Sequence, residues 1–162
     1  MTRWLTPEEE QMWRGWITAT RKLYGQLGHE MQANNGISMG DYEILLRLSE
    51  GPDKRLRMSE LADQTLASRS RLSHQVDRMA KSGLVRREAN PEDGRGLFAV
   101  LTEEGQAKLD EAAPSYVDGV RRTVYDVLTK RELATVGTIA RKVLANLDAE
   151  KAAAKENGRA RR

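Results

Sequence analysis

Apolar side chains recur along this chain in two kinds of pattern. Six stretches carry them at helical spacing, so that they form one face of an α-helix: 7–34, 38–48, 59–66, 68–82, 102–128 and 129–147. After Gly83 the pattern changes to period two, and two short stretches, 84–88 and 97–101, flank a polar segment, 90–96. The sequence therefore predicts a mainly α fold with a small β-hairpin.

The stretch 68–82 predicts the most sharply divided helix. Ser68 can cap its start with its hydroxyl, and Gly83 easily adopts the left-handed backbone that ends a helix. Its inward face is apolar and comprises Leu72, Val76, Met79 and Ala80. Its outward face is rich in guanidinium and hydroxyl groups and comprises Arg69, Ser70, Ser73, His74 and Arg78, with Arg71 and Gln75 at its flanks. Because 59–66 precedes it across a short connection, the pair predicts a helix-turn-helix.

Positive charge is concentrated in two places. The chain has 27 Lys and Arg against 24 Asp and Glu, a net charge of +3. Segment 66–87 alone carries +5 and the tail from Lys151 carries +4, which leaves −6 for the rest. A localised basic stripe on a helix is typical of a nucleic-acid-binding surface. A solvated amphipathic helix is the alternative, and the neighbouring helix and hairpin favour nucleic acid.

Composition argues against several other classes of protein. Without cysteine the chain has no disulfide or thiolate zinc site, and its two histidines are far apart, so we expect no metal or cofactor. No catalytic triad, phosphate-cradling loop or ligand cluster indicates an enzyme. The sequence GRGLFA at 94–99 formally matches a dinucleotide motif, but a strand follows its glycines instead of a helix. No apolar run or signal-peptide pattern indicates a membrane or secreted protein, and we expect a cytoplasmic location.

The first predicted helix has an apolar stripe larger than a small lobe can cover. Met12, Trp13 and Trp16 lie near its start, and the stripe continues to Met31. Packing against a second subunit is one explanation, and an ordinary core helix is the other.

Five segments of the sequence resemble winged-helix transcription regulators of the MarR (multiple-antibiotic-resistance repressor) family. They are 58–62 (MSELA), 70–79 (SRLSHQVDRM), 83–87 (GLVRR), 90–95 (NPEDGR) and 101–105 (LTEEG). The resemblance implies a homodimer whose helical dimerisation region comprises 1–35 and 102–150, and a winged helix-turn-helix lobe at 36–101. For 151–162, which lacks periodicity and is not a standard feature of the family, the composition predicts a disordered basic tail.

The resemblance also implies a regulator, with a repressor as our expectation, that binds double-stranded DNA at a palindromic operator. It implies that the 68–82 helix enters the major groove and places base contacts at Ser70, Arg71, Ser73 and His74. Arg69, Arg78, Arg86 and Arg87 are expected to contact phosphates, which fix position without reading sequence. The wing 90–96 is expected in the minor groove, with Asp93 orienting Arg95.

Members of this family commonly respond to small aromatic anions where the first, second and fifth helices meet. Five residues are candidates for such a ligand site: Trp16, Tyr24, His29, Tyr42 and Tyr116. For each of them, packing in the core or at the dimer interface is the alternative. For the chain as a whole, the alternative is a winged-helix module that binds an acidic protein partner without reading DNA sequence.

Overall fold

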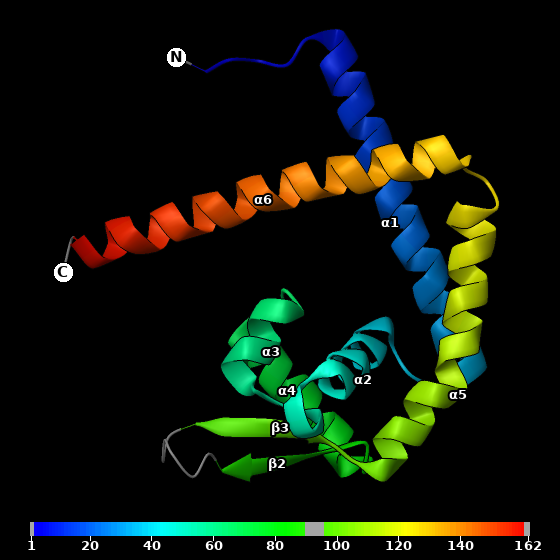
Figure 1. The fold of residues 1–162 in the computed structure, drawn as a ribbon, viewed down its shortest axis with the longest axis vertical. Coiled ribbons are helices and arrows are strands. Elements are labelled where there is room, and N and C mark those ends of the chain that lie inside the picture. The colour runs from blue at the N-terminus through cyan, green and yellow to red at the C-terminus, as the bar shows by residue number, and fades with distance from the viewer. Residues whose placement is uncertain (1, 90–95, 161–162) are drawn as a thin grey trace. The chain divides into compact units, whose positions relative to one another are not determined.

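The computed structural model describes residues 2–89 and 96–160, and Figure 1 shows the fold. The helices are α1 (Pro7–Asn35), α2 (Met39–Glu50), α3 (Met58–Gln64), α4 (Arg69–Lys81), α5 (Glu103–Val120) and α6 (Lys130–Ala160). The strands are β1 (Arg55–Arg57), β2 (Val85–Ala89) and β3 (Leu97–Leu101). A short 3₁₀ turn, Pro52–Lys54, precedes β1, and a π-helical turn, Arg121–Tyr125, follows α5. The predicted fold class is confirmed.

Side chains cap the starts of α1, α2 and α4, and the cap of α4 is the one predicted at Ser68. Thr6 and Ser38 each form a capping box, in which the Glu9 and Asp41 carboxylates accept a hydrogen bond from the backbone amide of the cap residue. The Ser68 Oγ accepts a hydrogen bond of 3.3 Å from the Arg71 amide. These bonds satisfy amides that have no partner within the helix, so each start is fixed locally.

The sheet has three strands in the order β1-β3-β2, and both pairings are antiparallel. Val85 pairs with Leu101 and Ala89 with Leu97, which forms the predicted hairpin. β1 was not predicted, and it places Arg57 opposite Phe98, near the start of β3. Two of its three residues are arginines, too short a run for alternation to be recognised in the sequence.

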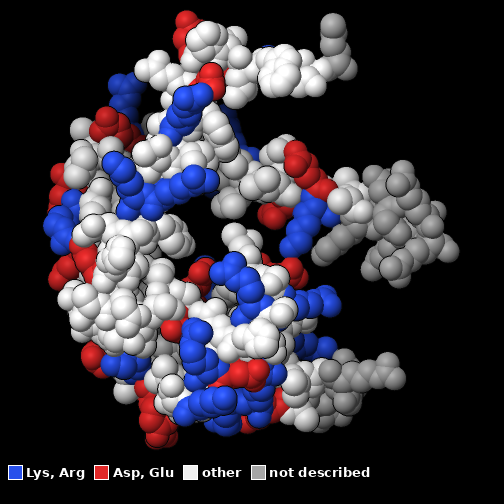
Figure 2. Space-filling model, turned by 180° about the vertical axis from the view of Figure 1, so that it is seen from behind, with Lys and Arg blue, Asp and Glu red and all other residues white. Residues whose placement is uncertain are grey.

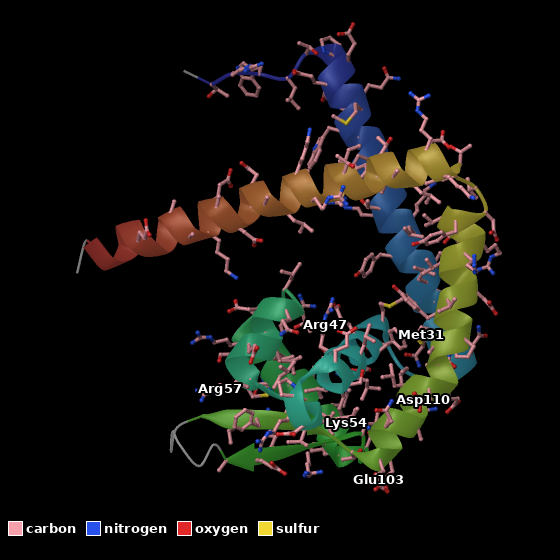
Figure 3. All side chains as sticks on the ribbon, viewed as in Figure 1. Met31, Arg47, Lys54, Arg57, Glu103 and Asp110 are labelled. Carbon is pink, nitrogen blue, oxygen red and sulfur yellow. The ribbon has the colours of Figure 1, made fainter. Side chains whose placement is uncertain are left out.

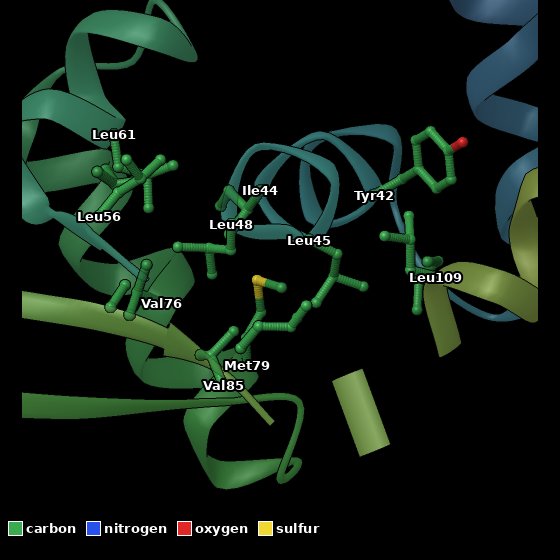
Figure 4. Close-up of a cluster of buried hydrophobic side chains, with 14 of the residues drawn as sticks. Tyr42, Ile44, Leu45, Leu48, Leu56, Leu61, Val76, Met79, Val85 and Leu109 are labelled. Atoms are coloured by element: carbon green, nitrogen blue, oxygen red, sulfur yellow. The ribbon is translucent and has the colours of Figure 1, made fainter. Parts of the chain in front are cut away.

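The core lies where α2, α3 and α4 pack on the sheet. Figure 4 shows Leu45, Leu48, Met79 and Val85 among the buried side chains of this cluster, with Leu109 of α5 at its edge. The inward face predicted for α4 is buried at Leu72, Val76 and Met79. Because this face is anchored in the core, the opposite face of α4 is held toward solvent.

Leu66 does not follow its predicted pattern. Its spacing from Leu61 and Ala62 placed it on the inward face of a helix, but α3 ends at Gln64 and the Leu66 side chain is 89% exposed. Its backbone has φ of +53°, because the chain reverses direction here between α3 and α4. The reversal determines where this side chain points, and local helical spacing does not.

The prediction of a disordered tail from Lys151 was wrong for residues 151–160, because α6 continues to Ala160. Ala152, Ala153 and Ala154 have high helix propensity, so the helix continues without an apolar stripe. Loss of periodicity was the wrong criterion for the end of this helix.

The chain forms two compact units, residues 1–119 and 120–162. The first holds the helices up to Gly119 and the sheet, and the second holds α6. The division into a dimerisation region (1–35 and 102–150) and a DNA-binding lobe (36–101) concerns a dimer and stays a prediction. Within residues 2–89 and 96–160, no helix is long and apolar enough to span a membrane.

Candidate nucleic-acid interface

The exposed face of α4 is polar and basic. Arg69, Ser70, Arg71 and His74 are all exposed, on the opposite side of the helix from its three buried residues. Among the described residues, the side chains of Arg69, Arg71 and His74 form no hydrogen bond or ion pair. Figure 2 shows Lys and Arg side chains gathered over the winged-helix lobe, with fewer acidic side chains among them. These groups are free to bind an external polyanion.

Arg87 has an internal role that the sequence did not reveal. Its Nη2 donates hydrogen bonds to the Ser73 carbonyl oxygen at 2.9 Å and to the Ser73 Oγ at 3.0 Å. It also lies 3.0 Å from the Asp77 Oδ1, and its side chain is only 24% exposed. Arg87 therefore ties β2 to the middle of α4, and the Ser73 hydroxyl proton is still available to donate.

Asp41 ties α4 to the start of α2. Its Oδ1 accepts hydrogen bonds from the Gln75 Nε2 at 3.0 Å and from the Arg78 Nη2 at 3.2 Å. Its Oδ2 accepts from the Ser38 Oγ at 2.7 Å, and the Asp41 side chain is 13% exposed. Arg78, predicted as a phosphate contact, is 65% exposed, so its ion pair with Asp41 contributes little by itself. The carboxylate mainly accepts hydrogen bonds that position α4.

Stability is expected to depend on the ionisation of Asp41. Burial disfavours the charged carboxylate, but hydrogen bonds from Ser38 and Gln75 and the Arg78 charge outweigh it and lower the pKa of Asp41. Because the pKa of Asp41 is lower in the folded state, its ionised carboxylate stabilises the protein at pH values above the ordinary aspartate pKa, about 3.9. That stabilisation is lost as the pH falls below this value. The Asp41→Asn variant should be about 1–2 kcal/mol less stable at pH 7. Urea unfolding between pH 3 and pH 7 should also show a shallower acid-side loss of stability in the variant, and an unchanged pH profile would contradict this role.

Basic residues also line the sheet beside α4. The Arg86 Nε donates to the Glu88 Oε1 at 2.8 Å on β2. Arg55 and Arg57 of β1 place their guanidinium carbons 5.1 and 5.8 Å from the centre of the Phe98 ring. Arg57, labelled in Figure 3, is exposed near the start of β3, which follows the predicted wing. It is a candidate phosphate contact that the sequence reading missed, and its only signal was the short alternation of Arg55, Leu56 and Arg57.

The predicted wing pair, Asp93 and Arg95, lies outside the described residues. Its proposed roles therefore rest on the sequence.

The structure brings together three of the five residues predicted for a ligand site. The rings of Tyr42 and Tyr116 lie 4.8 Å apart between centroids. Partial burial raises the pKa of Tyr24, whose side chain is still 63% exposed, and the nearby Glu43 and Tyr116 raise it further. Trp16 lies eight residues before Tyr24, about 12 Å along α1. His29 follows Tyr24 by five residues, about 140° around the helix, and it is exposed. Trp16 and His29 are therefore the two predicted residues that do not join the three tyrosines.

Known proteins with the same arrangement of elements identify the family. A family model described as MarR family matches residues 35–96. A solved structure of Sco3205, a MarR family transcriptional regulator from Streptomyces coelicolor in complex with DNA, is 45% identical to this chain, with a TM-score of 0.86. The match covers 90% of this chain and 92% of Sco3205. The chain belongs to the MarR family of transcriptional regulators.

Two further relatives extend this result. AbsC, a MarR family transcriptional regulator from Streptomyces coelicolor, is 44% identical over 91% of this chain and 99% of its own, with a TM-score of 0.85. The transcriptional repressor YetL from Bacillus subtilis (strain 168) is 32% identical over 94 residues, 56% of this chain and 56% of YetL. The chain therefore matches only about half the length of this curated relative. The MarR resemblance predicted from the sequence is confirmed.

Proposed function

We propose that this MarR family member is a dimeric, sequence-specific DNA-binding regulator, and specifically a repressor, that acts in the cytoplasm. The 68–82 helix lies in the major groove and the wing 90–96 in the minor groove. One observation carries the proposal: the outward face of α4 presents unpaired basic and hydroxyl groups, while its inward face is fixed in the core. Sco3205, a relative with 45% identity, has been solved in complex with DNA.

The side chains on α4 suit the two kinds of contact that such a helix makes. Arg71 can donate two hydrogen bonds to guanine O6 and N7, and Ser70 and His74 can reach neighbouring base edges or phosphates. Arg69 and Arg86 would contact phosphates, which supply affinity that depends on salt and not on sequence. Because Arg87 and Asp41 hold α4 in place through hydrogen bonds, its base-contacting side chains have little freedom to reorient.

Exposed apolar side chains support a dimer. On α1 they include Met12 (64% exposed) and Trp13 (51%), and on α6 they include Val143 (52%) and Leu144 (57%). Apolar stripes of this extent on soluble helices generally mark an interface. A two-fold dimer presents two copies of α4 to two half-sites, which is why the operator should be palindromic. Sedimentation at micromolar concentration should therefore give about twice the mass of the 18.2 kDa chain.

A small aromatic ligand is the proposed signal that releases the DNA. It would contact Tyr24, Tyr42 and Tyr116, which come from the three helices α1, α2 and α5. Glu43 lies beside Tyr24, and burial raises the pKa of this carboxyl group. A ligand panel should therefore contain neutral phenols as well as aromatic acids, since a charged Glu43 disfavours a second carboxylate nearby.

Selection from a random pool of DNA duplexes tests the proposal. The protein should enrich one motif with two-fold symmetry, and DNase footprinting should show protection of both halves. Reporter transcription from a promoter that contains the motif should fall when the protein is expressed. Enrichment of no motif would contradict sequence-specific binding and favour the protein-interaction alternative.

A further inference from the structure

Leu66 occupies a position where the backbone favours glycine. The Ala67 amide donates to the Ala62 carbonyl oxygen at 3.2 Å, the long hydrogen bond that closes the C-terminus of α3. Leu66 lies inside this closure with φ of +53°. Helices that end in this way usually have glycine there, because a Cβ crowds the left-handed backbone.

The chain itself uses glycine at the two comparable positions. Gly36 ends α1 with φ of +69°, and Gly83 follows α4 with φ of +75°. After α4, the Leu84 amide donates to the Met79 carbonyl oxygen at 3.0 Å, the same closure as at Leu66. Leucine at the end of α3 thus departs from the glycine that this chain has after α1 and α4. Burial of the side chain does not compensate for the backbone strain, because Leu66 is 89% exposed.

Leu66 also stands at the end of α4 where base contacts are expected. It precedes the cap residue Ser68 by two positions, and the first turn of α4 exposes Arg69, Ser70 and Arg71. The amino-terminal residues of a recognition helix are those that reach base edges. Every exposed side chain on α4 is polar, so α4 itself offers no apolar group to the groove. Leu66 supplies one next to it.

We propose that Leu66 reads thymine, by contact of its side chain with a thymine C5 methyl group in each half-site. The major groove displays this methyl group, and apolar side chains recognise it. A docking site for a protein partner fits less well, because Asp63, Gln64 and Ser68 surround Leu66 with exposed polar groups and a single leucine is far smaller than a stable interface. The inference rests on the proposed function, since it requires a specific operator.

Replacement of each operator thymine by deoxyuracil provides the test, because it removes only the methyl group. The wild-type dimer should lose about fourfold in affinity for each half-site substituted at one particular position, as expected for one buried methyl group. Leu66→Gly should bind the thymine and deoxyuracil operators equally. Leu66→Asn tolerates the same backbone and should behave like glycine, whereas Leu66→Met keeps an apolar side chain and should retain the preference for thymine.

Stability measurements distinguish a loss of thymine recognition from a loss of folding. Leu66→Gly relieves the backbone strain, so its urea unfolding midpoint should equal or exceed that of the wild type even as thymine discrimination disappears. If a selected operator has no thymine whose methyl group matters, or if Leu66→Gly keeps the wild-type discrimination, the inference is overturned and the proposed function stands. If the wild type selects no operator at all, both are overturned.

Discussion

Replacing Gly105 by alanine is expected to lower the free energy of unfolding by about 2–3 kcal/mol, the cost of forcing extra volume into a packed site. A Cβ at this position would overlap the backbone carbonyl oxygen of Leu84 and lie 2.8 Å from the Leu101 Cδ1. The Leu84 oxygen cannot withdraw easily, because it accepts a hydrogen bond from the Thr102 amide at 3.3 Å. The Thr102 Oγ1 in turn donates to the Gly83 carbonyl oxygen at 2.6 Å. This glycine therefore fixes α5 against the exit from α4.

Gly25→Ala provides the matched control. Gly25 is also helical, but nothing lies within 4 Å of the position that a Cβ would take. Alanine there should raise stability by up to about 1 kcal/mol, because it favours the helix over the unfolded chain. Urea unfolding followed by circular dichroism, at equal protein concentrations, measures both variants. Equal stabilities for Gly105→Ala and the wild type would show that α5 does not approach Leu84 as closely as the structure places it.

Replacing Arg71 by alanine is expected to weaken operator binding by about 1–3 kcal/mol for each half-site, which is the discrimination supplied by one bidentate base contact. Its guanidinium is exposed and bonds to no other described residue, so the substitution should leave the fold intact. Affinity for random DNA should fall much less, because only the nonspecific charge contribution is lost there. Fluorescence anisotropy with operator and scrambled duplexes measures this difference.

Two other arginine substitutions distinguish the loss of a base contact from the loss of support for α4 and from the loss of a positive charge. Arg14→Ala removes the same charge from α1, where Arg14 pairs with Glu10 at 2.6 Å, and should not change the preference for the operator. Arg87→Ala removes the tie between β2 and Ser73, so it should lower stability and weaken binding to both duplexes. If Arg71→Ala weakens both duplexes equally, Arg71 contacts phosphate and does not read bases.

The sequence predicted the parts of this fold that depend on local pattern. α4 was predicted because Leu72, Val76 and Met79 contrast strongly with the basic residues between them. Leu66 fits the same spacing, yet the turn that follows α3 directs it outward. Helical periodicity therefore identified a helix well and identified its last residues poorly.

Contacts between distant residues were beyond the sequence pattern. Asp41 and Arg78 are 37 positions apart, and Ser73 and Arg87 are 14 apart. Helical spacing gives Asp41 no role beyond the cap of α2, and Arg87 was interpreted only as a basic residue for phosphate. Their bracing roles depend on how α2 and β2 pack on α4, which helical spacing and charge do not specify.

We propose above all that this MarR family chain reads DNA sequence through the exposed face of α4. The most direct test is the dissociation constant of the wild-type protein for its selected duplex and for a scrambled duplex of equal composition, across a series of salt concentrations. Both affinities should fall as salt rises, because phosphate contacts release counterions. The selected duplex should bind at least about 10³-fold more tightly than the scrambled one at physiological salt. Equal affinities for the two duplexes at every salt concentration would contradict this proposal. The exposed face of α4 would then be a basic surface that binds DNA without sequence specificity.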